Sequence, residues 1–202
     1  MLVRLSDRKD IIAGVSSQYA LSSIDEKDHP EVYIHLEDEE AVAFFWEILK
    51  KDANRYEEFS KKISTQVVGS CSVVSTLSDL ANNGKLPYKS ISIVDGYKRD
   101  EYTNCLSLPG NKAPERLVFE DLKVQNWNKL DERFGIGAGV LFQYLDSSML
   151  DPDHHNWTTY VGDRVKKSKD TVWSIMVEEW CKQCLDNLTS EQFIEAISNR
   201  LT

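Results

Sequence analysis

The sequence predicts an α/β fold in which a mostly parallel sheet is flanked by helices and followed by an all-helical C-terminal extension. Short apolar runs of strand length alternate with helical segments over residues 31–125. The runs at 32–36 and 90–94 have the character of strands buried on both faces, which is typical of a parallel sheet. Beyond residue 125 the pattern changes to helices alone.

The first half of the predicted sheet begins after Pro30. The strand 32–36 is followed by apolar residues at helical spacing over 39–51, with an acidic start and a Lys50-Lys51 end that suit the helix dipole. Residues 53–62 indicate a second, more polar helix. Residues 65–68 then predict a short strand.

The second half of the predicted sheet repeats this alternation. Apolar residues over 73–81 predict a helix that Asn82-Asn83-Gly84 ends, and the strand at 90–94 follows. A fourth strand at 105–108 is stopped by Pro109-Gly110. Pro114 then opens the next helix at its first turn.

The C-terminal extension is predicted to contain helices over 153–165 and 170–188. Thr189-Ser190-Glu191-Gln192 resembles a capping box before a third helix. Gly135-Ile136-Gly137-Ala138-Gly139 lacks the spacing of a dinucleotide fingerprint, so we interpret it as close helix packing. We expect Trp157 and Trp173 to lie in the core.

The length and charge of the chain limit its organisation. Its 202 residues suit one good core with an appended helical lobe. We expect an N-terminal segment (1–30), an α/β domain (31–125) and a helical region (126–202). The net charge of −9 argues against simple electrostatic attraction to a polyanion, so a nucleic-acid role would need metal ions, local basic residues or a partner.

No targeting or metal-binding cysteine pattern stands out. No apolar run approaches the roughly 20 residues of a membrane helix, and the first ten residues lack the apolar core of a signal peptide. We therefore expect a cytoplasmic protein without a membrane partner. Cys181 and Cys184 form a CxxC with no second such pair, which indicates ordinary core thiols.

Two carboxylates close two of the predicted strands. Glu37 follows the strand 32–36, and Asp95 follows the strand 90–94. The carboxyl ends of parallel strands form the crevice in which open α/β sheets hold ligands. Carboxylate oxygens are hard ligands that suit Mg²⁺ or Mn²⁺. The pair therefore predicts a metal site at this edge of the sheet.

Several motifs together resemble the Toprim domain of the OLD-family (overcoming lysogenization defect) ATP-dependent nucleases. These motifs are Glu37 after one strand, Asp95-Gly96 after another, Leu108-Pro109-Gly110 and Pro114-Glu115. The resemblance covers residues 31–185 and implies a Toprim-like fold. It also implies a metal-dependent DNA endonuclease, with relatives that serve antiphage defence.

The resemblance also implies roles for individual residues. Glu37, Asp95 and Glu115 would hold one or two Mg²⁺ or Mn²⁺ ions. A lysine would stabilise the transition state, with Lys166 the leading candidate and Lys98 and Lys167 the others. His154 would assist proton transfer or contact phosphate. We expect His154 and His155 not to serve one site, because adjacent helical residues point about 100° apart.

Two positions depart from the family pattern. The usual DxD is Asp95-Gly96-Tyr97 here, and Ala41 stands where an acidic residue often follows the glutamate. The alternative is therefore a catalytically degenerate Toprim module that serves protein interaction or assembly. A receiver-like α/β domain ranks lower, because the strand at 65–68 does not end in an aspartate.

The N-terminal segment resembles part of a neighbouring module. Residues 11–17 look like the last strand and polar switch turn of an ABC-type ATPase, the module that precedes Toprim in OLD proteins. No Walker A motif occurs in this segment. The resemblance therefore implies DNA, an ABC-type ATPase domain or subunit, and further copies of the chain in a homo-oligomer as partners.

Overall fold

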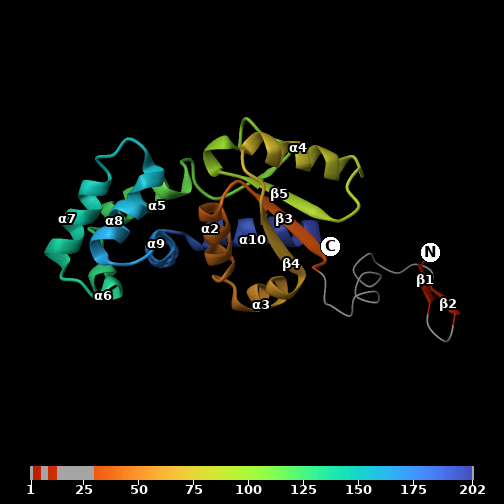
Figure 1. The fold of residues 1–202 in the computed structure, drawn as a ribbon, viewed down its shortest axis with the longest axis horizontal. Helices are drawn as coiled ribbons and strands as arrows, with labels where there is room; N and C mark the ends of the chain where they lie inside the picture. The colour runs from red at the N-terminus through yellow and green to blue at the C-terminus, as the bar shows by residue number, and fades with distance from the viewer. Residues whose placement is uncertain (1, 6–8, 13–29, 202) are drawn as a thin grey trace.

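The computed structural model of the chain describes residues 2–5, 9–12 and 30–201. Its central feature is a parallel sheet, flanked by helices and followed by a C-terminal helical region (Figure 1). Within the described residues this sheet has four strands in the order β4-β3-β5-β6. The strands are β3 (Val32–Leu36), β4 (Ile63–Val67), β5 (Ser90–Val94) and β6 (Leu106–Ser107). The predicted α/β class is therefore confirmed.

Three helices and one short turn connect the first strands. They are α2 (Glu39–Leu49), α3 (Ala53–Lys62), α4 (Cys71–Asn82) and the 3-10 turn η1 (Gly96–Lys98). Aspartates cap the first two helices: Oδ1 of Asp38 accepts the backbone N–H of Ala41 at 2.7 Å, and Oδ1 of Asp52 accepts that of Arg55 at 3.1 Å. Such caps satisfy backbone donors that have no partner within the helix. They fix where α2 leaves the end of β3.

Side chains of β3 alternate between the two faces of the sheet. Val32, Ile34 and Leu36 belong to the main hydrophobic core, whereas His35 pairs with Ser92 across the strands. The α4 helix covers one face, and α2 and α3 cover the other (Figure 1). Successive strand residues point to opposite faces of the sheet, where helices cover them. The residues just past the strand ends lie beyond these covered faces and can form a site.

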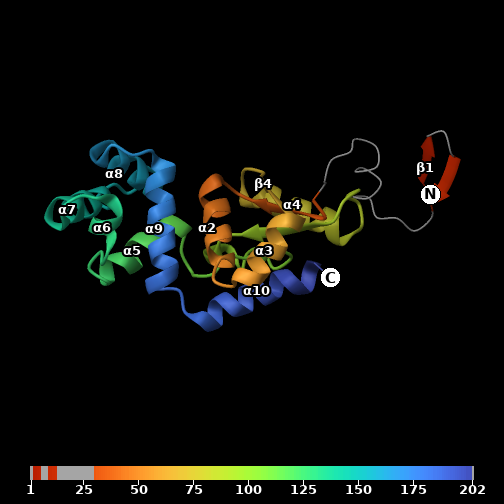
Figure 2. The same ribbon diagram turned by 90° about the horizontal axis from the view of Figure 1, so that it is seen from below.

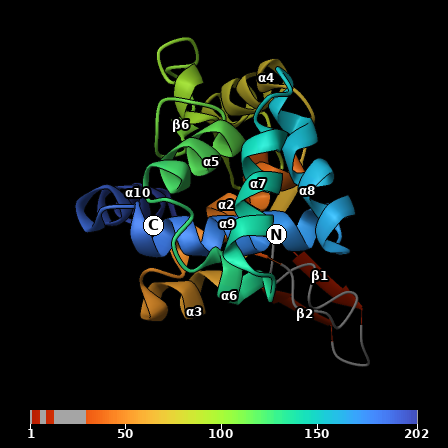
Figure 3. The ribbon, with the colours of Figure 1, turned by 90° about the vertical axis from the view of Figure 1, so that its left-hand side faces the viewer.

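Six further helices follow the sheet within the described residues, and the last five of them form the helical region. They are α5 (Pro114–Val124), α6 (Leu130–Phe134), α7 (Ala138–Ser148), α8 (Trp157–Val165), α9 (Lys169–Gln183) and α10 (Asn187–Leu201), with a 3-10 turn η2 (His154–Asn156) before α8. The α9 helix contacts α2 as well as α5, α6 and α8. Figure 2 shows it between the sheet domain and the outer helices, and Figure 3 shows the region end-on.

Aromatic side chains join the helical region to the sheet domain. The ring of Phe44 on α2 lies 5.0 Å from that of Trp180 and 6.5 Å from that of Trp173, between centroids. The indole N–H of Trp173 donates to the carbonyl of Glu40 at 2.9 Å, and that of Trp180 donates to Oδ2 of Asp121 at 2.8 Å. The predicted burial of Trp157 and Trp173 is confirmed, since each is 3% exposed.

Two predictions about the helical region are wrong, and two of its helices are missing from the predictions. The helix predicted over 170–188 ends at Gln183, and Asp186 caps the next one by accepting the N–H of Thr189 at 2.8 Å. The helices α6 and α7 were not predicted. A methyl group added at Gly135, Gly137 or Gly139 would meet nothing within 4 Å, so these glycines do not serve close packing. Gly135 instead ends α6 in a left-handed conformation.

The N-terminal segment is described only in part. Strands β1 (Leu2–Leu5) and β2 (Lys9–Ile12) pair in an antiparallel hairpin. The predicted strand and switch turn over 11–17 overlap β2 in residues 11–12, and their remainder lies outside the described residues.

Candidate metal centre

The register of the sheet places acidic residues side by side. Strand β3 pairs with β5 so that His35 lies opposite Ser92. Asp38 comes three residues after His35, and Asp95 comes three residues after Ser92. The residue that this register brings level with Asp95 is therefore Asp38, with Glu37 one position before it.

Asp95 is a buried carboxylate on which the charges of three other carboxylates act. Its side chain is buried, with 8% of the residue exposed. Burial raises the pKa of Asp95 to about 8. The negative charges that act in the same direction are those of Asp38, Glu37 and Glu115. The predicted residues Glu37 and Glu115 are therefore near enough for their charges to act on Asp95, and so is Asp38.

Glu37 is the less buried member of this group. Burial and the charge of Asp38 raise its pKa, whereas Lys98, His155 and a hydrogen bond from the backbone N–H of Cys71 act against the rise. Cys71 is the first residue of α4. Glu37 is thus held beside the positive end of that helix, where the helix dipole favours an anion.

Glu115 occupies the first turn of α5, after Pro114 at the helix start. It is 2% exposed, and burial raises its pKa. Its Oε1 lies 2.8 Å from Nδ1 of His155, and its Oε2 lies 3.9 Å from Nε2 of His154. One ligand atom from each of these three residues lies within 4.8 Å of the others. Glu115, His154 and His155 therefore form a cluster that could hold a metal ion.

Both histidines face the same carboxylate, so the expectation that they could not serve one site is wrong. They lie in the short turn η2, where the two rings are tilted by 35° to each other with centroids 4.1 Å apart. Each ring approaches a different oxygen of Glu115. The spacing of a regular α-helix does not apply to this turn, because it is a single 3-10 turn that lies against the start of α5.

Arg116 fixes the orientation of His154. Its Nε donates to Nδ1 of His154 at 3.3 Å, and its Nη2 donates to the carbonyl of Pro152 at 2.9 Å. Burial lowers the pKa of His154, and the charges of His155 and Arg116 lower it further. The pKa of His155 is raised: burial lowers it, but Glu115 more than compensates. The two rings therefore differ in basicity.

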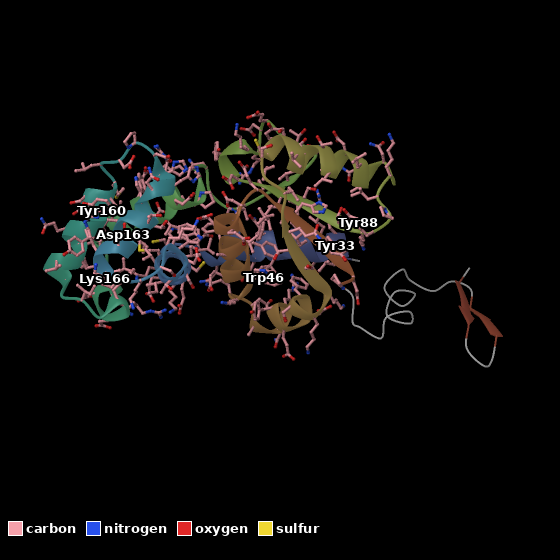
Figure 4. The ribbon with its side chains drawn as sticks, in the orientation of Figure 1. Tyr33, Trp46, Tyr88, Tyr160, Asp163 and Lys166 are labelled. Atoms are coloured by element: carbon pink, nitrogen blue, oxygen red, sulfur yellow. The ribbon has the colours of Figure 1, made fainter. Side chains whose placement is uncertain are left out.

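Of the three lysines predicted as candidates, Lys98 lies near the carboxylates and Lys166 does not. Lys98 acts on Glu37, and Lys169 acts on Asp38. Lys166 is an exposed residue at the C-terminal end of the nine-residue helix α8. That position is about 14 Å along the helix from η2, and Figure 4 places Lys166 in the helical region, away from the sheet. The structure does not bring Lys166 to the cluster.

Sequence reasoning missed Asp38 and His155. Asp38 has a readable signal, since an aspartate directly before Glu39-Glu40 is typical of a helix cap, but a cap alone does not predict a site residue. His155 was set aside in favour of His154. The path of the loop that places η2 against α5 has no local sequence signal.

The surroundings of this cluster define an α/β domain with carboxylates and histidines gathered at the carboxyl edge of a parallel sheet. Comparison of the chain with models of protein families, with curated proteins and with solved structures gives no match. Among the described residues, no helix combines the length and apolar character that a membrane crossing requires.

Proposed function

We propose that this chain is the Toprim-like domain of a metal-dependent DNA endonuclease of the OLD type. The observations that carry the proposal are the cluster of Glu115, His154 and His155 and the action of the charges of Glu37, Asp38 and Glu115 on the buried Asp95 after strand β5. Buried like charges destabilise one another unless a proton or a cation neutralises them, and this arrangement supports a role in cation binding. Their oxygen atoms suit Mg²⁺ or Mn²⁺.

The residues would divide the chemistry among them. Glu37, Asp95 and Glu115 would hold the ion, and Asp38 would add negative charge while capping α2. A bound Mg²⁺ or Mn²⁺ supplies an activated water and neutralises charge on the phosphate. In the hydrolysis, a bond forms between the water oxygen and phosphorus, the P–O ester bond breaks, and the departing oxygen takes up a proton.

Basic residues beside the carboxylates supply the remaining roles. Lys98 lies close enough to act on Glu37, so it replaces Lys166 as the lysine that would stabilise the transition state. His154 would contact the phosphate or the departing oxygen, held in place by Arg116. These roles need no residue from outside the described chain.

The partners belong to the same proposal. A net charge of −9 supports DNA binding that depends on metal ions and on a second module. We place an ABC-type ATPase domain or subunit in that role, with the chain acting as a homo-oligomer in the cytoplasm. Antiphage defence is the biological setting that the OLD resemblance implies.

A second candidate function is favoured by Tyr97. This residue occupies the second acidic position of the usual DxD, and Ala41 occupies another acidic position. A site with fewer carboxylates binds divalent cations less tightly. The alternative function is a catalytically degenerate module that serves protein interaction or assembly.

Plasmid cleavage tests the proposal directly. The purified chain is incubated with supercoiled plasmid and Mg²⁺ or Mn²⁺, beside Glu37→Ala, Asp95→Asn and Glu115→Gln. The matched control is Glu57→Ala, which removes an exposed carboxylate on α3. We expect cleavage by the wild type and the control and its loss in the three site variants. No metal-dependent cleavage by folded wild-type protein, or equal cleavage by all variants, would favour the degenerate module.

A further inference from the structure

Tyr97 is unusual for its exposure and for its place. It is 49% exposed, and it is the only Phe, Tyr or Trp in the described part of the chain that falls in the exposed class. It follows Asp95 by two residues, at the carboxyl edge of the sheet. Large aromatic rings gain most when they are buried, so an exposed ring at a candidate site suggests a surface for a flat ligand.

The backbone that carries Tyr97 is tightly held. The turn η1 is closed by the N–H of Lys98, which donates to the carbonyl of Asp95 at 2.9 Å. A side chain at Gly96 would collide with the carbonyl groups of Gly110 and Leu108. The close approach of these backbone segments fixes the position from which the Tyr97 ring projects. The ring is therefore presented by a rigid turn rather than by a flexible loop.

Charged groups surround the Tyr97 ring. The ammonium of Lys98 lies 5.4 Å from the ring centroid, and it also pairs with Glu101 at 2.7 Å. Burial raises the pKa of the Tyr97 phenol, and the charges of Asp95 and Glu37 raise it further. An aromatic face, a cation and a cluster of carboxylates thus lie within reach of one ligand. A nucleotide combines the three complementary groups: a flat base, an anionic phosphate and oxygens for a bridging metal ion.

We infer that Tyr97 is a stacking platform for a nucleobase beside the phosphate to be cut, and that the substrate is a nucleic acid with an unpaired nucleotide at this position. The inference deepens the proposed function and rests on it. In a duplex, both faces of each base are covered by neighbouring base pairs, so only an unpaired base offers a face to the ring. Every base has such a face, so the contact is tolerant of sequence.

Binding measurements on Tyr97 variants test this inference. The probes are a fluorescein-labelled oligothymidylate of about 12 nucleotides, within the length that such sites bind, and a hairpin duplex of similar length. Binding is followed by fluorescence anisotropy with Ca²⁺ in place of Mg²⁺. The matched control is Tyr160→Ala, because Tyr160 also pairs with a cation, Arg164 at 3.3 Å from its ring centroid, but lies in the helical region (Figure 4).

We expect Tyr97→Ala to lose about 5- to 150-fold in affinity for the single strand, the range measured when one base-stacking aromatic is removed. Tyr97→Phe and Tyr160→Ala should bind as the wild type does, and duplex affinity should be little changed in all three. Equal losses for single strand and duplex in Tyr97→Ala, or an equal loss in Tyr97→Phe, would overturn the inference. So would an absence of single-strand binding by the wild type.

Cleavage of the same two oligonucleotides in Mg²⁺ or Mn²⁺ separates this inference from the proposed function. Cleavage by the wild type that does not distinguish Tyr97→Ala from Tyr97→Phe overturns the stacking role and leaves the nuclease. Selective loss of single-strand binding without cleavage by any protein supports the stacking role and overturns the nuclease.

Discussion

Nδ1 of His155 lies 2.8 Å from Oε1 of Glu115, and this contact joins the turn η2 to the start of α5 across 40 residues of sequence. The carboxylate is almost fully buried, so the histidine is its partner inside the protein. Glu115 thereby stands between two groups of side chains. Its charge acts on Asp95 together with the charges of Asp38 and Glu37, and one of its oxygens lies within 4.8 Å of a ring nitrogen of His154 and of His155.

The mixed ligand set predicts a preference among metal ions. Imidazole nitrogens favour Co²⁺ or Zn²⁺ over Mg²⁺, which prefers oxygen. We expect His155→Ala and His154→Ala each to weaken Zn²⁺ or Co²⁺ binding by about tenfold or more while leaving Mg²⁺ binding unchanged. Isothermal titration calorimetry measures both affinities, with Lys166→Ala as the control. Unaltered Zn²⁺ and Co²⁺ affinity in both histidine variants would exclude the histidines as ligands.

The raised pKa of Asp95 predicts how stability depends on pH. Its folded pKa of about 8 lies above the ordinary value of 3.8, so the folded protein binds more protons than the unfolded chain between these values. The free energy of unfolding must therefore fall as the pH rises through this window. The wild type should lose this free energy and Asp95→Asn should not. The difference between their free energies of unfolding should therefore shift by about 1–3 kcal/mol in favour of Asp95→Asn between pH 5 and pH 8.

Urea unfolding at several pH values checks this expectation. Glu57→Ala is the control, because it removes an exposed carboxylate away from the group. Wild-type and Asp95→Asn curves that stay parallel from acid to pH 8 would show that Asp95 is not the residue that titrates. Added Mg²⁺ should stabilise the wild type at the alkaline end, since a cation favours the ionised carboxylates.

Replacing Tyr97 by aspartate should restore the missing carboxylate. Tyr97 lies close enough to Asp95 and Glu37 for their charges to act on it. An aspartate there would add an oxygen ligand, and we expect Mg²⁺ affinity to rise by about tenfold or more. Tyr97→Asn is the control for shape without charge. An equal response in the two variants would mean that the added charge does not reach the ion.

Much of the fold follows from local patterns in the sequence. The predicted helix at 53–62 coincides with α3, and the strands at 32–36 and 90–94 coincide with β3 and β5. Apolar spacing and caps are local, so they are readable without the tertiary structure. The five-residue helix α6 is too short to show a period, and the fourth strand shrinks to Leu106–Ser107 because its length depends on pairing with β5.

The candidate site was less predictable than the fold. Glu37, Asp95 and Glu115 stand at element ends that the sequence marks, and the structure gathers them. Asp38 enters through the register of β3 against β5, which strand composition does not specify. Lys98 is placed near the site by the turn η1, and His155 by the loop that leads to the turn η2. The resemblance predicts Lys166, but this residue lies at the far end of helix α8 from the turn η2 and so away from the cluster.

Gly96 offers a test of how far the site depends on close backbone packing. A methyl group there would collide with the carbonyl groups of Gly110 and Leu108, which are backbone atoms and yield only if the segments move apart. We expect Gly96→Ala to lower the free energy of unfolding by about 1–3 kcal/mol. Because the turn carries Tyr97 and follows Asp95, metal binding should weaken as well.

The matched control for this change is Gly139→Ala, since a methyl group at Gly139 in helix α7 meets nothing within 4 Å. The free energy of unfolding of that variant should exceed that of the wild type by about 0.5–1 kcal/mol, because alanine loses less conformational entropy than glycine in a helix. Urea unfolding gives both values, and calorimetry with Mg²⁺ gives the change at the site. If Gly96→Ala were as stable as the wild type and bound Mg²⁺ equally well, the contact with Gly110 would not position the carboxylates.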